Sequence, residues 1–302
     1  MSGHQDQTIV ITGATGKQGG AVLRRLLSSG WRVRAITRNP SKPEARELSK
    51  LRCEVVRCDL SDRPTLDQIL RDAYGVYSVQ TWWEEGVEGE VTQGKTVADA
   101  AQAAGIKHLV YSSVVGADLH TGVPHFESKW TIEQYIRSLG LPATILRPVF
   151  FMDNYSSADF RESILGGTLS QPFRPDKRIP MIAVEDIGAF AGLAFENPLS
   201  FIGKVLTLAG DELTMPEAAE TFHRVVGRSV TYKQAPIEDV RRYSPELATM
   251  FQWFNENDLR VNIPACRVMH PQLMTFEAWL HRAGWDKLLV KQPEEFVYVP
   301  VI

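Results

Sequence analysis

The chain has 302 residues, of which 44% are hydrophobic and 23% are charged, and its formal net charge is −3. This composition is ordinary for a globular protein of one large or two moderate domains, and it lacks the positive excess that gathers nucleic acid. No apolar run is long enough to cross a membrane or to act as a secretion signal. We therefore expect a cytoplasmic protein without a membrane partner or direct contact with nucleic acid.

The first half of the chain alternates short apolar runs with stretches of helical periodicity. The apolar runs predict six strands, at residues 8–12, 32–37, 54–60, 76–80, 108–113 and 142–148. Helical stretches fall between them, at residues 17–30, 43–51, 65–75, 91–105 and 126–140. This alternation predicts an α/β fold, a Rossmann-type doubly wound parallel sheet with right-handed crossovers.

After Arg147 the alternation fails, and residues 150–182 are irregular and rich in aromatic residues, glycine and proline. A helix at residues 183–197 and a seventh strand at residues 204–210 resume the pattern. We therefore expect a Rossmann domain at residues 1–150, completed by about 182–210. Residues 151–181 and 211–302 are expected to form a smaller, mixed region that covers the cleft at the carboxyl edge of the sheet.

A glycine-rich turn follows the first predicted strand. The segment TGATGKQGG places Gly13, Gly16 and Gly19 between a strand and a helix. Glycine is needed where a backbone turns sharply, approaches a pyrophosphate closely and packs against the sheet. The free N–H groups of the following helix would face the phosphates. In this context the pattern predicts a dinucleotide site, and a purely structural turn is the alternative.

The end of the second predicted strand bears on which dinucleotide is bound. An NAD site usually has an acidic residue there, which bonds the ribose 2′-hydroxyl. The sequence instead reads ITRNPSKP, with Arg38 at that place and Lys42 after it. A guanidinium can bind a 2′-phosphate with two hydrogen bonds, so the sequence favours NADP(H). The alternative is that Arg38 is only a solvated surface charge.

Six segments carry a likeness to a known family: GATGKQGG, VRAITRNP, AYGVYSVQTWWE, QGKTVADAAQAAGIKHLVYSS, HFESKWTIEQYIRSLGLPATILRP and FFMDN. They span residues 8–154 almost without a gap, and the later VEDIG and LTMPEAAETF segments fit as well. The sequence thereby resembles the NmrA-like family of atypical short-chain dehydrogenases. It is most similar to the branch that includes NADPH sensors and transcriptional co-regulators.

The resemblance implies an NADP(H) site at the carboxyl ends of the strands. The pyrophosphate would be held by the glycine-rich turn: Gly13, Ala14, Thr15, Gly16, Lys17, Gln18 and Gly19. The adenosine end would be contacted by Arg38, Lys42, Asp59 and Leu60. The nicotinamide end would be lined by Gln80, Thr81, Trp82, Lys129, Phe151, Asp153 and Asn154. Simple burial is the alternative for Trp82, and packing in the core or cleft is the alternative for residues 151–154.

The catalytic residues of the superfamily are only partly kept. Ordinary members use a Tyr with a Lys four residues later, and a Ser on the fifth strand. Here Lys129 and Ser113 are present, but His125 stands at the Tyr position. Imidazole has an ordinary pKa of about 6.5 and could donate a proton, although it is shorter than a phenol and Lys129 would favour its neutral form. Either His125 acts as a general acid, or it only packs at the helix start while Lys129 binds the ribose.

Other kinds of site have little support. The seven histidines show no paired spacing suited to zinc, so no metal is expected, and no G-x-S-x-G segment occurs. The three cysteines, an odd and sparse set, fit a reducing compartment. The acidic residues 84–90 are expected to form a solvated loop rim, which could act as a mobile lid.

Two functions remain open. The first is an NADP(H)-binding redox sensor or regulator, in which cofactor binding shifts the region after Arg147 and a partner protein detects the change. The second is an NADPH-dependent reductase of quinones, enones or similar carbonyl compounds, with Phe150, Phe151, Tyr155 and Phe173 as pocket walls. A purely structural interaction module would not explain the glycines and Arg38 together. An oligomer is compatible with either function.

Overall fold

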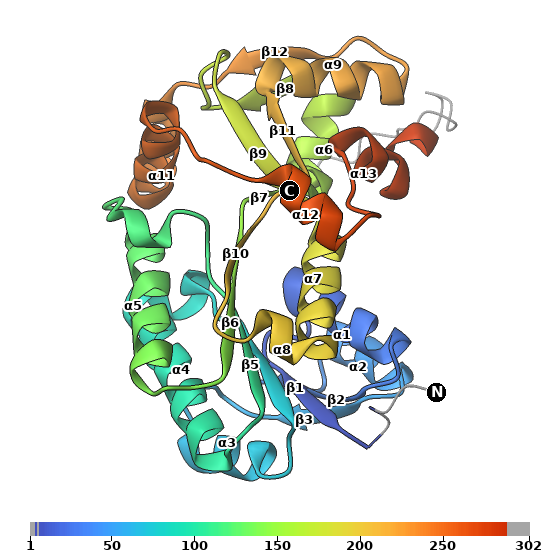
Figure 1. Cartoon of the computed structure of the whole chain (residues 1–302). Helices are drawn as coiled ribbons and strands as arrows, with labels where there is room; N and C mark the ends of the chain where they lie inside the picture. Colours follow the sequence, from blue (N-terminus) through green and yellow to red (C-terminus); the bar gives the residue numbers. More distant parts are fainter. Residues whose placement is uncertain (1–3, 5, 289–302) are drawn as a thin grey trace, which may run out of the picture. The chain divides into compact units, whose positions relative to one another are not determined.

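The computed structural model describes residue 4 and residues 6–288, which form two compact units (Figure 1). The first unit contains the described residues up to Phe151, together with Val184–Ala209 and Leu259–Leu273. The second contains Met152–Ala183, Gly210–Asp258 and the described residues from Met274 onward.

The first unit is built on a seven-stranded sheet in which all neighbouring strands are parallel. In spatial order the strands are β10 (Val205–Leu208), β6 (Ala143–Pro148), β5 (His108–Ser112), β4 (Gly75–Ser78), β1 (Thr8–Ile11), β2 (Arg32–Thr37) and β3 (Glu54–Arg57). The strand order reverses between β1 and β4, and ligands of doubly wound sheets bind at the carboxyl edge beside such a point. The prediction of an α/β fold with a Rossmann-type sheet is confirmed.

Helices cover both faces of this sheet (Figure 1). One face carries α3 (Arg63–Leu70), α4 (Trp82–Ala104) and α5 (Pro124–Ser138). The other carries α1 (Lys17–Ser28), α2 (Pro43–Lys50), α7 (Val184–Glu196) and α8 (Pro198–Phe201). The unit also contains η1 (Ala117–Leu119), β7 (Phe150–Phe151) and α12 (Ile263–Met269).

The apolar strands predicted from the sequence supply the core of the first unit. Val10, Val76 and Leu109 are fully buried on the sheet, where they join one cluster with Val97 of α4 and Ile132 of α5. Burial of this apolar surface on both sides of the strands explains why they read as continuous apolar runs.

The acidic segment at residues 84–90 differs from its prediction, because it is helical and belongs to α4. The helix is interrupted at Gly86, whose φ of 69° and ψ of −178° lie outside the helical region. Glu84 and Glu85 are exposed, but Glu90 is fully buried. The expected solvated loop is therefore wrong, and Glu90 is part of the interior.

The second unit contains two small sheets with surrounding helices. In the first sheet β9 (Arg178–Ile182) pairs antiparallel with β11 (Asp211–Thr214), and in the second β8 (Thr168–Gln171) pairs parallel with β12 (Thr231–Gln234). The remaining elements are η2 (Met152–Ser156), α6 (Ala158–Leu165), α9 (Met215–Val226), α10 (Ile237–Tyr243), α11 (Pro245–Glu256), α13 (Phe276–Arg282) and η3 (Trp285–Lys287). α9 begins with a capping box between Thr214 and Glu217.

Aromatic residues form the core of the second unit. The Tyr155 ring lies 5.4 Å from that of Phe222 and 5.5 Å from that of Phe276, measured between centroids. Tyr155 and Phe173 are both 0% exposed. They are therefore core residues of this unit, and their expected role as pocket walls is wrong.

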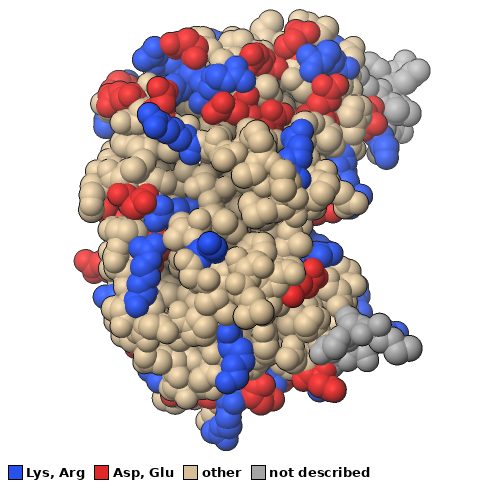
Figure 2. Space-filling model, in the orientation of Figure 1, with Lys and Arg blue, Asp and Glu red and all other residues tan. Residues whose placement is uncertain are grey.

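Several features of the described residues bear on the classes of site that are possible. No helix among them combines the length and apolar character needed to span a bilayer. No cluster of three or more His, Cys, Asp or Glu among them could hold a metal ion, and their cysteines are free. On the face shown in Figure 2, basic and acidic side chains are interspersed among uncharged residues.

Candidate functional site

The turn between β1 and α1 has the conformation that its glycines predict. Gly13 adopts a φ of 61°, which favours glycine, and its carbonyl accepts a 2.9 Å hydrogen bond from the Gly16 N–H. A Cβ on Gly19 would lie 2.3 Å from the Gly13 carbonyl oxygen. Gly19 is therefore needed for the close approach of α1 to the turn.

The start of α1 is suited to an anion. Its N-cap residue is Gly16, no side chain caps it, and its first turn has no acidic residue. The N–H groups of a helix start and the positive end of the helix dipole favour a phosphate. The turn is fixed to the switch point by Thr12, whose hydroxyl donates to the Val79 carbonyl (2.8 Å) and accepts from the Val79 N–H (2.7 Å).

Gln18 connects α1 to the neighbouring strands. Its Oε1 accepts a 2.7 Å hydrogen bond from the Ser112 hydroxyl at the end of β5 and a 3.4 Å bond from Tyr77 of β4. Of the other turn residues, Ala14 is buried, whereas Thr15 and Lys17 are exposed. The side-chain oxygen of Gln18, a residue expected to contact the pyrophosphate, thus links α1 to β4 and β5.

Arg38, just beyond β2, is ion-paired with the first turn of α4. Its Nη2 donates to Glu84 Oε2, and its Nη1 lies 3.8 Å from Glu85 Oε1. The sequence shows no acid beside Arg38, but folding brings two carboxylates to it from another strand–helix unit. Lys42 is the exposed N-cap residue of α2.

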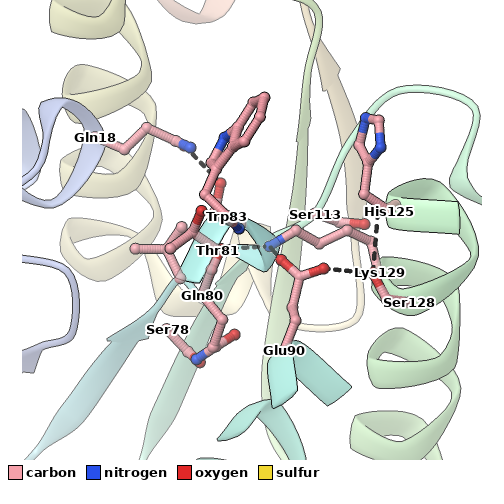
Figure 3. A network of polar contacts seen from close by, with 12 residues as sticks. Gln18, Ser78, Gln80, Thr81, Trp83, Glu90, Ser113, His125, Ser128 and Lys129 are labelled. Carbon is pink, nitrogen blue, oxygen red and sulfur yellow. Dashed lines mark hydrogen bonds and ion pairs between the residues drawn. The ribbon is translucent and has the colours of Figure 1, made fainter. Parts of the chain in front are cut away.

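Lys129 of α5 lies in a buried polar network (Figure 3). Its Nζ donates to the Gln80 carbonyl at 2.9 Å and lies 2.9 Å from Glu90 Oε1. Ser128 donates its hydroxyl to Glu90 Oε2. The contact with the Gln80 carbonyl is a hydrogen bond, and the contact with Glu90 is an ion pair. Lys129 is thus held at the end of β4.

His125 packs against the aromatic residues at the start of α4. Its ring stacks on Trp82 with centroids 5.1 Å apart, and Trp82 in turn stacks on Trp83 at 3.9 Å. In Figure 3 the His125 ring and the Lys129 ammonium leave α5 in different directions. Burial, with the charges of Glu90 and Glu133, raises the pKa of the nearby Tyr111 well above its ordinary value.

Ser113 belongs to a second buried network. Its hydroxyl donates to Glu133 Oε1 at 2.5 Å, and the same carboxylate accepts two hydrogen bonds from Arg147. Burial lowers the pKa of the Arg147 guanidinium, but hydrogen bonds to Glu133 and Asp118 outweigh it, and the net shift is upward. Ser113 is thus engaged by an interior carboxylate at the position where the superfamily places its catalytic serine.

The other predicted contacts are distributed over both units. Asp59 is exposed after β3, and Leu60 packs against the core of the first unit. Gln80 is buried, and its side-chain amide donates to Ser78. Thr81 is the N-cap residue of α4, and Phe151 ends β7. Asp153 and Asn154 belong to η2 in the second unit.

Sequence reasoning missed the carboxylates Glu84, Glu90 and Glu133. A signal for Glu90 was available, because it continues the buried stripe of α4 through Gly94, Val97 and Ala101 at helical spacing. The pairing of Glu84 with Arg38 has no local signal, since the two residues lie 46 positions apart.

Relatives of known name include both regulators and oxidoreductases. The chain is 30% identical over 330 residues to the NmrA-like oxidoreductase malD of Malbranchea aurantiaca, covering 93% of this chain and 97% of that one. It is 30% identical over 251 residues to the nitrogen metabolite repression protein nmrA of Emericella nidulans, covering 78% and 70%. A Dictyostelium discoideum NmrA-like protein is 29% identical over 265 residues, covering 82% and 87%.

Solved structures share the fold. The negative transcriptional regulator NmrA in complex with NADP superposes with a TM-score of 0.77 at 24% identity, covering 91% of this chain and 94% of that one. An Escherichia coli NADPH-dependent quinone oxidoreductase complexed with NADPH gives a TM-score of 0.78 at 24% identity, covering 91% and 99%. The model of the NmrA-like family matches residues 5–280. The chain belongs to the NmrA-like family.

Proposed function

We propose that the chain binds NADP(H) at the carboxyl edge of the sheet in its first unit. The observation that carries the proposal is the turn between β1 and α1, where Gly19 leaves no room for a Cβ and Gly16 leaves the helix start without a side-chain cap. Such a turn binds a pyrophosphate through backbone N–H groups. Arg38 would contact the 2′-phosphate, and Lys129 would donate to the nicotinamide ribose.

The ligands of related proteins support this proposal. NmrA structures hold NADP in one case and NAD in another, and the E. coli quinone oxidoreductase holds NADPH. When bound, such a cofactor supplies or accepts a hydride. The protein's own residues position it, exclude water and manage protons.

Within that frame, we favour a redox sensor or regulator. Two residues of the tyrosine-dependent proton relay are altered. His125 stands at the tyrosine position and stacks on Trp82, and the Ser113 hydroxyl donates to Glu133. The glycine turn, which would bind the pyrophosphate, is nonetheless kept. A protein that binds the cofactor without this relay can still report its oxidation state, if the two forms stabilise different conformations.

Calorimetric titration of the protein with NADPH and with NADP+ tests the regulator. We expect both to bind, with affinities that differ at least about fivefold, the lower end of ordinary coupling free energies. Equal affinities would exclude redox sensing while leaving cofactor binding intact. Absence of binding by either form would exclude the function as a whole.

A reductase is the second candidate, and the geometry of Lys129 favours it. Its Nζ donates to the Gln80 carbonyl at the end of β4, next to where the nicotinamide ribose is expected, so an ordered water or substrate oxygen there could receive a proton from it. NADPH consumption should be followed with a quinone and an enone, for the wild type and for Lys129→Met and His125→Ala. Turnover that survives His125→Ala but fails in Lys129→Met would support this candidate. No turnover with either substrate would count against it.

A further inference from the structure

Arg38 meets two carboxylates at the position where a 2′-phosphate is expected. Glu84 and Glu85 lie in the first turn of α4, and each approaches a different terminal nitrogen of the guanidinium. The side chains of Arg38, Glu84 and Glu85 are 44%, 51% and 54% exposed. A ligand can therefore reach these groups from solvent.

The carboxylates and a 2′-phosphate would require the same N–H groups. A guanidinium binds a phosphate through two parallel hydrogen bonds, and bidentate binding commonly uses its terminal nitrogens. Glu84 already accepts from Nη2, so a 2′-phosphate must displace it. An ion pair at an exposed site is worth only about 0.2–1 kcal/mol, which makes displacement feasible but not free.

A dinucleotide without the 2′-phosphate meets the opposite situation. The ribose 2′-hydroxyl of NAD(H) is a hydrogen-bond donor, and NAD sites usually offer it an acidic residue near the end of the second strand. The chain has Arg38 at that place, but the ion pair brings the Glu84 carboxylate beside it. The same pair thus presents an acceptor for NAD(H) and a cation for NADP(H).

We propose that Glu84, assisted by Glu85, determines how strongly the site prefers NADP(H) over NAD(H). The proposal rests on the proposed dinucleotide site and adds the residue that sets its selectivity. Glu84 lowers the affinity for NADP(H) by occupying Arg38, and it supports NAD(H) by accepting from the ribose. The wild type accepts both cofactors with a modest preference.

Gly86 explains how this turn is separated from the rest of α4. Its φ of 69° breaks the helix just after Glu85, and a Cβ there would meet nothing within 4 Å. The positive φ, rather than a lack of space, is therefore what requires glycine. The turn that carries Glu84 is consequently aimed at Arg38 without following the axis of residues 87–104.

Titration calorimetry on the full chain at low salt tests the proposal, with Kd measured for NADPH and NADH. In Glu84→Gln we expect the ratio of Kd for NADH to Kd for NADPH to rise about two- to fivefold, the range of a surface ion pair. Glu88→Gln is the matched control, because Glu88 is exposed on the same helix and the variant removes the same charge. Its ratio should equal that of the wild type.

The Arg38→Ala background identifies the mechanism. There, Glu84→Gln should no longer tighten NADPH binding, because no guanidinium is left to release. Tightening that persists would mean that Glu84 only repels the phosphate, which overturns the competition. If the wild type binds both cofactors and Glu84→Gln leaves the ratio unchanged, the selectivity role is overturned and the cofactor site survives. If neither cofactor binds, the proposed function and this inference fail together.

Discussion

At the scale of single residues, two fully buried carboxylates of the first unit are ion-paired with basic side chains. Glu90 pairs with Lys129, and Glu133 pairs with Arg147 and with the more exposed Arg137. Both carboxylates are 0% exposed. Because an ion is costly to bury without a partner, each pair fixes the position of its cation. The Lys129 pair lies at the proposed cofactor site, whereas the Arg147 pair holds Ser113.

Loss of the Glu133 charge should destabilise the fold. In Glu133→Gln, Arg147 keeps Asp118 as its only anionic partner among the described residues, so we expect a loss of about 3 kcal/mol or more in the free energy of unfolding. Urea denaturation measures this. Glu47→Gln, which removes an exposed ion pair with Lys50, should cost about 0.5 kcal/mol or less. Similar losses in the two variants would contradict the structural role of Glu133.

His108 should make stability depend on pH. It is buried on β5, where its Nε2 donates to the Thr144 hydroxyl, and that hydroxyl donates to the Phe201 carbonyl. Among the described residues its Nδ1 has no hydrogen-bond partner, so a second proton would be buried without an acceptor. Burial lowers the pKa of His108 from 6.5 to about 4.

The unfolded chain therefore binds a proton at His108 at a higher pH than the folded chain does. Stability from this residue is fully present above pH 6.5 and is lost as the pH falls toward about 4. The loss amounts to about 3 kcal/mol, at roughly 1.4 kcal/mol per pKa unit. Urea denaturation between these pH values should give a shallower pH dependence in His108→Gln than in the wild type. Parallel curves would refute the assignment.

At the scale of elements, glycines set how closely helices approach. A Cβ on Gly188 of α7 would lie 2.8 Å from the backbone carbonyl of Ala21 in α1. A Cβ on Gly192, one turn later, would meet only the Arg25 side chain, also at 2.8 Å. Backbone atoms cannot move aside without shifting a helix, whereas a half-exposed arginine side chain can.

The two alanine variants should therefore differ. We expect Gly188→Ala to destabilise the protein by about 1–3 kcal/mol, the usual cost of overpacking. Gly192→Ala should have a smaller effect, and the gain in helix propensity offsets part of it. Thermal unfolding of both variants provides the comparison. A greater loss in Gly192→Ala would mean that α1 and α7 are not in rigid contact.

The elements of the site were predictable to different degrees. The glycine turn and Lys129 are visible in the sequence, because a strand–turn–helix context and the i+4 spacing from His125 are local features. The first turn of α4 was not, since Gly86 and Gly89 among glutamates resemble a loop. The residues after Gly86 nevertheless continue as a helix, in which Glu90 is held by Lys129 and Ser128. A buried ion pair depends on tertiary structure, which local propensity does not record.

At the scale of the whole molecule, the parallel sheet and a smaller, mixed C-terminal region were predictable, whereas the internal packing of that region was not. Strands covered on both faces are continuous apolar runs, and regular helices separate them. The second unit has short strands and an aromatic core around Tyr155 and Phe222, whose contacts join distant parts of the sequence. Its tyrosine and phenylalanine residues therefore suggested a ligand pocket when they form a core.

Cofactor binding should also stabilise the molecule, because a ligand that binds only the folded state raises its free energy of unfolding. At a concentration of 100 times Kd the gain is about 2.7 kcal/mol. The melting temperature should thus rise with NADPH, and by less in Arg38→Ala at the same concentration. A rise that is equal in both proteins would mean that Arg38 does not contact the cofactor.

The most direct test of the account is a calorimetric titration of the wild type and Arg38→Ala with NADPH and NADH. The wild type should bind NADPH saturably at one site per chain. Arg38→Ala should bind it about tenfold more weakly, corresponding to the loss of a charge-assisted contact worth about 1.4 kcal/mol, while NADH binding changes little. No saturable binding of NADPH by the wild type, or identical NADPH affinities in the two proteins, would contradict the central claim.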